Sequence, residues 1–204
     1  MISHKHKFIY IHIPKTAGTS IYRTVQQIYQ HPLDLTPQWD YKHNIYKQHA
    51  TISQLKNLYQ IPISDYFKFT VIRNPYERAV SSYFWLRRLL GHSTTFKDFL
   101  LVRNGYDKIN HFENNKGRKD HFLTQSEFIK INGIITMDFL IKFENLQEDF
   151  NNVCRKIGLP KCNLHHINQS KHKHYTEYYD EETKQIVAEK YAEDIEQFGY
   201  EFRR

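Results

Sequence analysis

Three short apolar runs alternate with segments of helical spacing along the chain, and they predict the strands of one sheet. The runs are Phe8–Ile13, Phe67–Ile72 and Phe139–Phe143. Each is rich in β-branched and aromatic residues, which favour a buried strand. Because a helical pattern follows each run, we expect parallel strands connected by helices that cover both faces of the sheet.

The helices are predicted from apolar residues three and four positions apart and from the residues at their ends. The clearest helix follows the second strand, where Asn74 suits the N-cap, Pro75 the first helical position and Gly91 the end. A last helix is expected to begin near Asp180 and to end at Gly199. Further helix starts are expected at Thr19, Thr51 and Leu146. The sequence therefore predicts an α/β fold, in which a parallel sheet is flanked by helices.

Length, charge and cysteine content narrow the class of protein. With 204 residues the chain fits a single domain, which we expect to span residues 1–204. Two cysteines form no disulfide framework. No uncharged apolar run approaches the roughly 18 residues that cross a bilayer, and the N-terminal residues lack a signal-peptide pattern. We therefore expect a cytoplasmic protein without a membrane span. The net charge of +7 favours an anionic partner, although a basic composition alone explains it equally well.

The first candidate site lies between the first strand and its helix, in Ile13-Pro-Lys-Thr-Ala-Gly-Thr-Ser20. A strand that turns through small residues into a helix N-terminus presents backbone N–H groups and the positive end of the helix dipole to an anion. The string is not the Walker A pattern, because its lysine precedes its glycine. The alternative is an ordinary strand-to-helix turn with a good cap. The candidate anion ligands are Lys15, Thr16, Ala17, Gly18, Thr19 and Ser20.

The second candidate site begins where the second strand ends, in Val71-Ile-Arg-Asn-Pro-Tyr-Glu-Arg-Ala-Val-Ser81. Ligands of open α/β sheets lie at this edge, so Arg73 and Ser81 could hold a second anion. A Walker B strand would end in Asp to hold magnesium, whereas this one ends in Arg. The alternative for Arg73 is a structural ion pair with Glu77 or Glu144.

The two strings together resemble the sulfotransferases that use 3′-phosphoadenosine 5′-phosphosulfate, and most of all the carbohydrate sulfotransferases. The likeness covers most of the chain, from about Lys7 to Phe202, and suggests a compact bacterial member. The resemblance implies a P-loop-like parallel sheet and transfer of a sulfuryl group to a hydroxyl of a sugar or oligosaccharide, neutral or acidic. Further similar segments are Lys47–Thr51, Asp65–Thr70, Asp138–Leu146, Asn168–Lys171, Tyr178–Thr183 and Phe198–Phe202.

The resemblance also implies a role for each candidate residue. Residues 15–20 would hold the 5′-phosphosulfate, with Lys15 offsetting charge on the leaving oxygen. Arg73 and Ser81 would hold the 3′-phosphate, and Ser170 would lie in a loop that covers the nucleotide. His49 would be the general base, because family members place a base in this part of the chain and its ordinary pKa suits the task. An exposed or capping histidine is the alternative for His49.

Gln125 would face the acceptor, after His121 in the string Asp120–Gln125. No metal is expected, because the spacing of Cys154 and Cys162 does not fit a zinc site.

Two rival functions remain open. One is a basic nucleotide- or nucleic-acid-binding protein without transfer chemistry, although no RNA-binding aromatic motif occurs and we expect no nucleic-acid partner. The other is a small-molecule kinase, which the missing Walker A and strand-end Asp disfavour.

Overall fold

The structure is a computed structural model of the chain. It describes residues 1–28, 39–40, 42, 45–91, 93–107, 119–164 and 173–203. The chain divides into two compact units, each built from two stretches of sequence. The sheet unit comprises Met1–Ile72 and Gln125–Ile167, and the helical unit comprises Arg73–Thr124 and Asn168–Arg204. That the two form a single domain stays a prediction.

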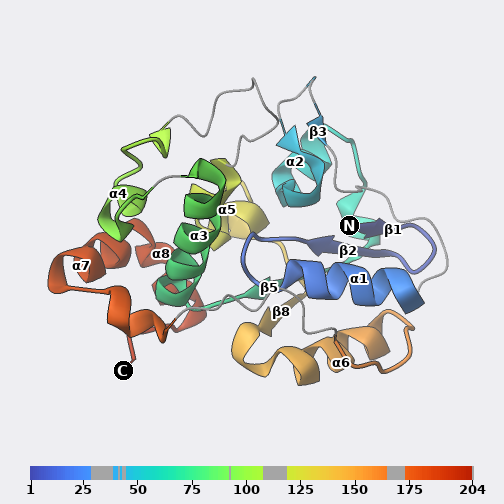
Figure 1. The fold of residues 1–204 in the computed structure, drawn as a ribbon. Coiled ribbons are helices and arrows are strands. Elements are labelled where there is room, and N and C mark those ends of the chain that lie inside the picture. Colours follow the sequence, from blue (N-terminus) through green and yellow to red (C-terminus); the bar gives the residue numbers. More distant parts are fainter. Residues whose placement is uncertain are drawn as a thin grey trace. The chain divides into compact units, whose positions relative to one another are not determined.

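The sheet unit is organised around four strands in the order β1-β2-β5-β8 (Figure 1). Their bounds are Ile2–Ser3 for β1, Phe8–Ile11 for β2, Phe67–Ile72 for β5 and Phe139–Lys142 for β8. β2, β5 and β8 are mutually parallel, and β1 is antiparallel to β2. The predicted parallel strands are therefore confirmed. The first and third strands end earlier than expected, because His12 and Ile13 belong to the following loop and Phe143 starts a 3-10 turn.

Helices cover the sheet on both sides. α1 (Gly18–Ile28) and α6 (Leu146–Lys156) lie on one side of the strands in Figure 1, and α2 (Ile52–Asn57) lies on the other. Alternate residues of the strands pack with the apolar stripes of α1 and α6 to form the core, as the periodicity predicts. The buried members of this core include Phe8, Tyr10, Ile21, Val25, Phe69, Val71, Ile141, Phe150 and Val153.

The remaining elements of the sheet unit are short. The predicted helix after Thr51 is α2, whose capping box joins Thr51 to Gln54 through two hydrogen bonds, of 2.8 and 3.1 Å. α5 (Gln125–Ile129) contacts α2. The others are β3 (Trp39–Asp40), β4 (Ile45–Tyr46), η1 (Lys47–His49), η2 (Ile63–Asp65), β6 (Lys130–Ile131), β7 (Ile134–Ile135) and η6 (Phe143–Asn145).

The helical unit is built on α3 (Pro75–Leu90), whose ends lie where the sequence predicts them. The Asn74 side chain accepts from the N–H of Tyr76, Pro75 occupies the first turn, and Gly91 closes the helix in the left-handed conformation with φ 70°. The other elements among the described residues of this unit are α4 (Phe96–Leu100), η5 (Lys119–Phe122), η7 (Tyr175–Tyr178), α7 (Glu181–Lys190) and α8 (Ala192–Phe198).

The predicted helix from Asp180 to Gly199 is wrong in one respect, because it is interrupted. Tyr191, with φ −114° and ψ 25°, ends α7 and precedes α8. Its ring is buried in the core of the helical unit beside residues of α3 and α4. The apolar spacing continues across the break unchanged. Within the described part of the chain, no helix combines the length and apolar character needed to cross a membrane.

Candidate active site

The loop between β2 and α1 has a backbone suited to an anion. Lys15 and Ala17 are both left-handed, with φ 68° and 67°, although neither is glycine. Alternation of backbone handedness turns successive N–H groups toward one point and forms an anion-binding nest. The first turn of α1, which the structure describes in full, contains no acidic residue that would compensate the positive end of the helix. The loop therefore combines a backbone of alternating handedness with a favourable dipole.

The side chains of this loop differ in how far they are buried. Thr16 is fully buried, and its Oγ1 donates to the carbonyl oxygen of Ile13 over 2.9 Å. Its hydroxyl proton thus closes the turn, so Thr16 offers a ligand chiefly its backbone N–H. Lys15 and Thr19 are half-buried and Ser20 is buried. The hydrogen bond from Ser20 N to Ala17 O, 3.0 Å long, begins the helix.

His49 is the last residue of η1 in the sheet unit and is half-buried. Its imidazole meets two other rings edge-on. The His12 ring centroid lies 4.7 Å away with an interplanar angle of 76°, and the Tyr46 centroid lies 5.1 Å away with an angle of 79°. His12 lies directly after β2, at the start of the candidate anion loop. The structure therefore brings the predicted base beside the residue that leads into that loop.

Arg73 is the first residue after β5 and opens the helical unit. It is 9% exposed, and its Nη2 donates to Glu77 Oε1 over 2.7 Å, which is the ion pair considered from the sequence. A guanidinium carries five N–H donors, so this bond does not by itself exclude a phosphate. Ser81 lies on α3 and is 2% exposed. The strand-end arginine and the helical serine are thus both present in largely buried positions.

The comparisons with known proteins bear on this arrangement. The model of the sulfotransferase family matches residues 1–201. The chain belongs to the sulfotransferase family. An uncharacterised protein of Archaeoglobus fulgidus is 30% identical over 97 residues, which are 47% of this chain and 71% of that protein. The crystal structure of a sulfotransferase from Alicyclobacillus acidocaldarius matches with a TM-score of 0.50 at 14% identity, covering 96% of each chain. At that identity the likeness shows the fold, and the predicted P-loop-like α/β architecture is confirmed.

The two remaining predicted residues of this sulfotransferase are Gln125 and Ser170. Gln125, the first residue of α5, is fully buried, so its side chain presents no exposed surface to an acceptor in this conformation. Its role at the acceptor stays a prediction. Ser170 lies outside the described residues, as does all of the Asn168–Lys171 loop that was expected to cover the nucleotide.

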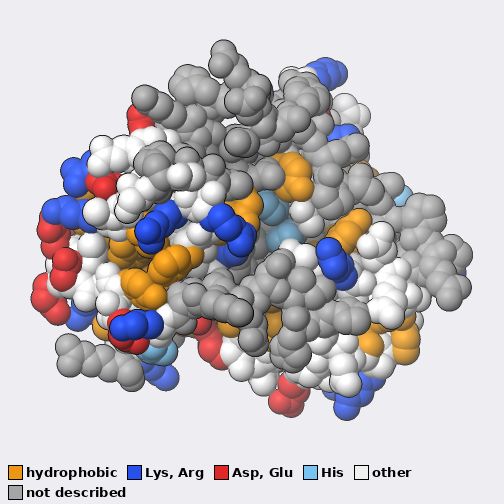
Figure 2. All heavy atoms as spheres, viewed as in Figure 1, with side chains coloured by type: hydrophobic (Ala, Val, Ile, Leu, Met, Phe, Trp, Pro, Cys, Tyr) orange, Lys and Arg blue, Asp and Glu red, His pale blue; other side chains and the backbone are white. Residues whose placement is uncertain are grey.

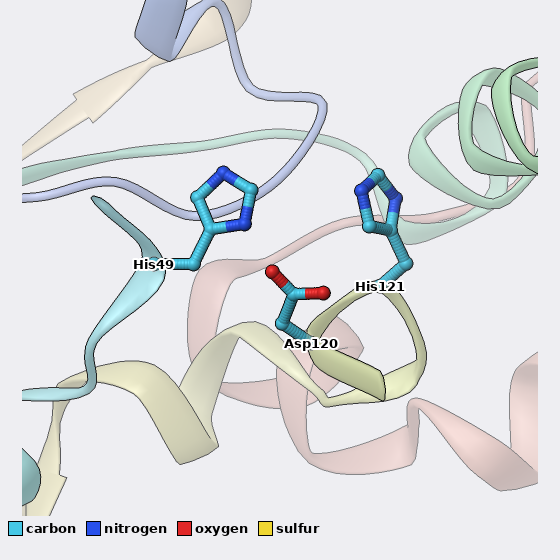
Figure 3. Close-up of side chains that lie close together, drawn as sticks. All are labelled: His49, Asp120 and His121. Atoms are coloured by element: carbon cyan, nitrogen blue, oxygen red, sulfur yellow. The ribbon is translucent and has the colours of Figure 1, made fainter. Parts of the chain in front are cut away.

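Sequence reasoning gave no role to Arg78, which has the largest fully buried side chain among the described residues. Its Nη1 donates to the carbonyl oxygen of Leu123 over 3.0 Å, directly after the segment that carries Asp120 and His121. His121 stacks on Trp85 of α3 with centroids 4.4 Å apart and an interplanar angle of 4°. Arg78 and Trp85 therefore fix η5 against α3. The sequence signal for Arg78 was its place in the string Val71–Ser81. Figure 3 shows the side chains of Asp120 and His121 on η5 and that of His49 on η1.

The two cysteines are neighbours in the sheet unit. Cys154 is buried on α6 and Cys162 is half-buried in the segment after it. Burial raises the pKa of the Cys154 thiol to about 12, and it also raises the pKa of Cys162. Thiols in this state are poor nucleophiles and poor metal ligands, since both tasks need the thiolate. This agrees with a packing role for the pair.

Proposed function

We propose that this sulfotransferase takes its sulfuryl group from 3′-phosphoadenosine 5′-phosphosulfate and transfers it to a hydroxyl of a sugar or oligosaccharide. The observation that carries the donor assignment is the nest formed by the left-handed Lys15 and Ala17 ahead of α1. Such a site suits an anionic group that approaches the backbone closely. In this proposal residues 15–20 hold the 5′-phosphosulfate.

The 3′-phosphate is assigned to Arg73 and Ser81, with Ser170 contributing to the cover over the nucleotide. β2 and β5 are hydrogen-bonded parallel neighbours, so the loops that follow them start at the same edge of the sheet. That topology supports one nucleotide with a phosphate group at each loop. Arg73 suits the task because a guanidinium binds phosphate through two parallel N–H bonds.

His49 and Lys15 carry the chemistry in this proposal. His49 accepts the proton of the acceptor hydroxyl while its oxygen forms a bond to sulfur. On the opposite side of the sulfur, the bond to the 5′-phosphate oxygen breaks, and Lys15 offsets the negative charge that remains on that oxygen. The other loop residues hold the two reactants in line, which is the main contribution a protein makes to such a transfer. We expect the reaction to need no metal, because Lys15 supplies the positive charge.

The rival functions are less well supported. A nucleic-acid-binding protein usually presents a continuous basic surface, whereas acidic side chains gather where α7 lies in the view of Figure 2. α7 itself has Glu181 and Glu182 in its first turn. A small-molecule kinase would require magnesium ligands at the end of the second strand, where this chain has Arg73.

The experiment is a transfer assay with donor labelled in its sulfuryl group and a panel of neutral and acidic oligosaccharides. We expect label to appear on at least one acceptor and transfer to survive excess EDTA. Activity lost to EDTA and restored only by Mg²⁺ or Zn²⁺ would overturn the metal-free mechanism. Tight nucleotide binding without transfer to any acceptor would favour the binding-protein alternative, and phosphate transfer from labelled ATP would favour the kinase.

A further inference from the structure

Gly18 is a glycine for a steric reason, and that reason is the ring of His12. A Cβ placed on Gly18 would lie 1.9 Å from both Cδ2 and Nε2 of His12 and 2.6 Å from Cε1. The backbone of Gly18 is not left-handed, so its conformation does not call for glycine. The close approach of the His12 ring therefore explains why position 18 carries no side chain.

The same His12 ring also contacts the predicted base. His12 and His49 meet edge-on at 4.7 Å, and Tyr46 contacts His49 at a similar angle. His49 ends a three-residue 3-10 turn whose N-cap makes no side-chain hydrogen bond. So short a turn fixes a side chain weakly, and the rings of His12 and Tyr46 add contacts that restrict the imidazole.

We propose that His12 is a positioning residue for His49, holding the base against the loop that binds the donor. The proposal rests on the function proposed above, in which His49 is the base. His12 lies in contact with Gly18 at the start of α1 and with His49 on η1, so one buried ring links the donor loop to the base. Its contribution is the shape of the ring, which keeps the proton acceptor at the correct place and angle.

Kinetic constants of three variants test this role. His12→Ala removes the ring and should lower kcat by about ten- to a hundredfold, as small displacements of a reacting group do. KM for the donor should change by no more than about twofold, because residues 15–20, which hold the donor in this proposal, are unchanged. His12→Phe keeps a ring of similar shape and should recover most of kcat. Loss of activity in His12→Phe as large as in His12→Ala would show that the imidazole nitrogens act directly, which overturns a role through shape.

Tyr10→Phe is the matched control. Tyr10 stacks on His12 with centroids 6.0 Å apart and an angle of 25°. Its hydroxyl is buried with no hydrogen-bond partner among the described residues. Removing that oxygen keeps the ring that supports His12, so kcat should stay at the wild-type value. A fall in kcat equal to that of His12→Ala would mean that any change in this core lowers activity, and positioning would be rejected.

A double variant shows whether His12 acts through His49. In a His49→Ala background the ring of His12 has no base to position, so His12→Ala should cause no further loss of kcat. An equal loss in both backgrounds would overturn the proposal. If His12→Ala alone is unstable, His12→Ala/Gly18→Ala places a methyl group in the vacated space. That variant should regain stability while its kcat stays low.

A measurement that needs no acceptor separates this proposal from the proposed function. The ring protons of His49 can be assigned in NMR spectra by their disappearance in His49→Ala. We expect them to shift in His12→Ala and to return toward wild-type positions in His12→Phe. Unchanged His49 signals in His12→Ala would overturn the positioning role, whatever the transfer assay shows. Shifted signals in a protein that sulfates no acceptor would instead overturn the proposed function and leave the ring contact established.

Discussion

Arg73, two residues before α3, forms an ion pair with Glu77 in the first turn of that helix, with 2.7 Å between Nη2 and Oε1. The arginine side chain is 11% exposed and the glutamate side chain 28%. A partly buried cation next to one carboxylate is either a structural pair or a phosphate ligand that the carboxylate orients. If Arg73 binds phosphate, a nucleotide with a 3′-phosphate should stabilise the fold more than one without it. If the pair is only structural, the two nucleotides should stabilise the fold equally.

The first prediction concerns nucleotide discrimination by Arg73. Adenosine 3′,5′-bisphosphate should stabilise the wild-type fold by about 2.7 kcal/mol at a hundredfold excess over its dissociation constant. AMP lacks the 3′ group and should stabilise much less at the same concentration. Arg73→Lys cannot form the two parallel bonds of a guanidinium, so thermal melts should show a smaller advantage of the bisphosphate.

Glu77→Gln is the control for this prediction. It breaks the ion pair but keeps the guanidinium and removes a negative charge near the expected phosphate. The advantage of the bisphosphate over AMP should therefore be maintained or increased. Equal melting shifts with the two nucleotides in the wild-type protein would remove the 3′-phosphate role from Arg73 and Ser81 and leave the ion pair as the role of Arg73.

The second prediction separates the base from the donor ligand. His49→Ala should lower kcat by about 10²–10⁴, the usual contribution of a placed general base, with donor affinity nearly unchanged. Lys15→Ala should weaken both donor binding and kcat, because Lys15 would contact the donor before and during transfer. Steady-state kinetics on one acceptor measure both effects. A His49→Ala enzyme with near wild-type kcat would place the base elsewhere, with His12, His121 and Glu144 as the next positions to test.

Local signals predicted much of the fold, and contacts distant in sequence supplied the rest. The bounds of β5 and α3 follow from an apolar run and from Asn74, Pro75 and Gly91, all of which act within a few residues. The break at Tyr191 could not be predicted, since the apolar spacing continues across it and gives no sign of a helix end. The contact of His12 with His49 could not be predicted either, because hydrophobic periodicity reports on one helix or strand and not on contacts between elements. The anion loop was visible as a motif, but its two left-handed residues were not.

The third prediction concerns acid stability at Asp98 in the helical unit. The Thr95 hydroxyl, followed by the Arg103 guanidinium, holds the pKa of Asp98 well below its usual range. The carboxylate accepts from Thr95 Oγ1 over 2.7 Å and from Arg103 Nε over 2.8 Å. Because the pKa is lower in the folded state, the unfolded chain binds the proton first as the pH falls. The stabilisation is complete above the ordinary value of about 3.9 and is lost as the pH falls toward the folded value.

Urea unfolding of wild type and Asp98→Asn across pH 3 to 7 measures this effect. The wild type should be more stable near neutral pH, and its advantage should narrow below about pH 4, where unfolded Asp becomes protonated. Glu182→Gln is a suitable control, because its ion pair with Lys97 is exposed and should contribute little at any pH. A difference between wild type and Asp98→Asn that stays constant down to pH 3 would contradict a role for the Asp98 charge.

The fourth prediction contrasts two neighbouring small residues, Ala17 and Gly18. Ala17 is left-handed at φ 67°, which costs an L-residue about 1–2 kcal/mol and costs glycine nothing. Ala17→Gly relieves that strain but adds about 0.4–1 kcal/mol of unfolded-state entropy, so the net change in stability should be small. Gly18→Ala places its methyl group 1.9 Å from the His12 ring and should destabilise the fold by about 1–3 kcal/mol. Chemical denaturation of the two variants measures both free energies. Equal tolerance of the two substitutions would show that the His12 ring moves aside readily, and Gly18 would then owe its identity to the anion site alone.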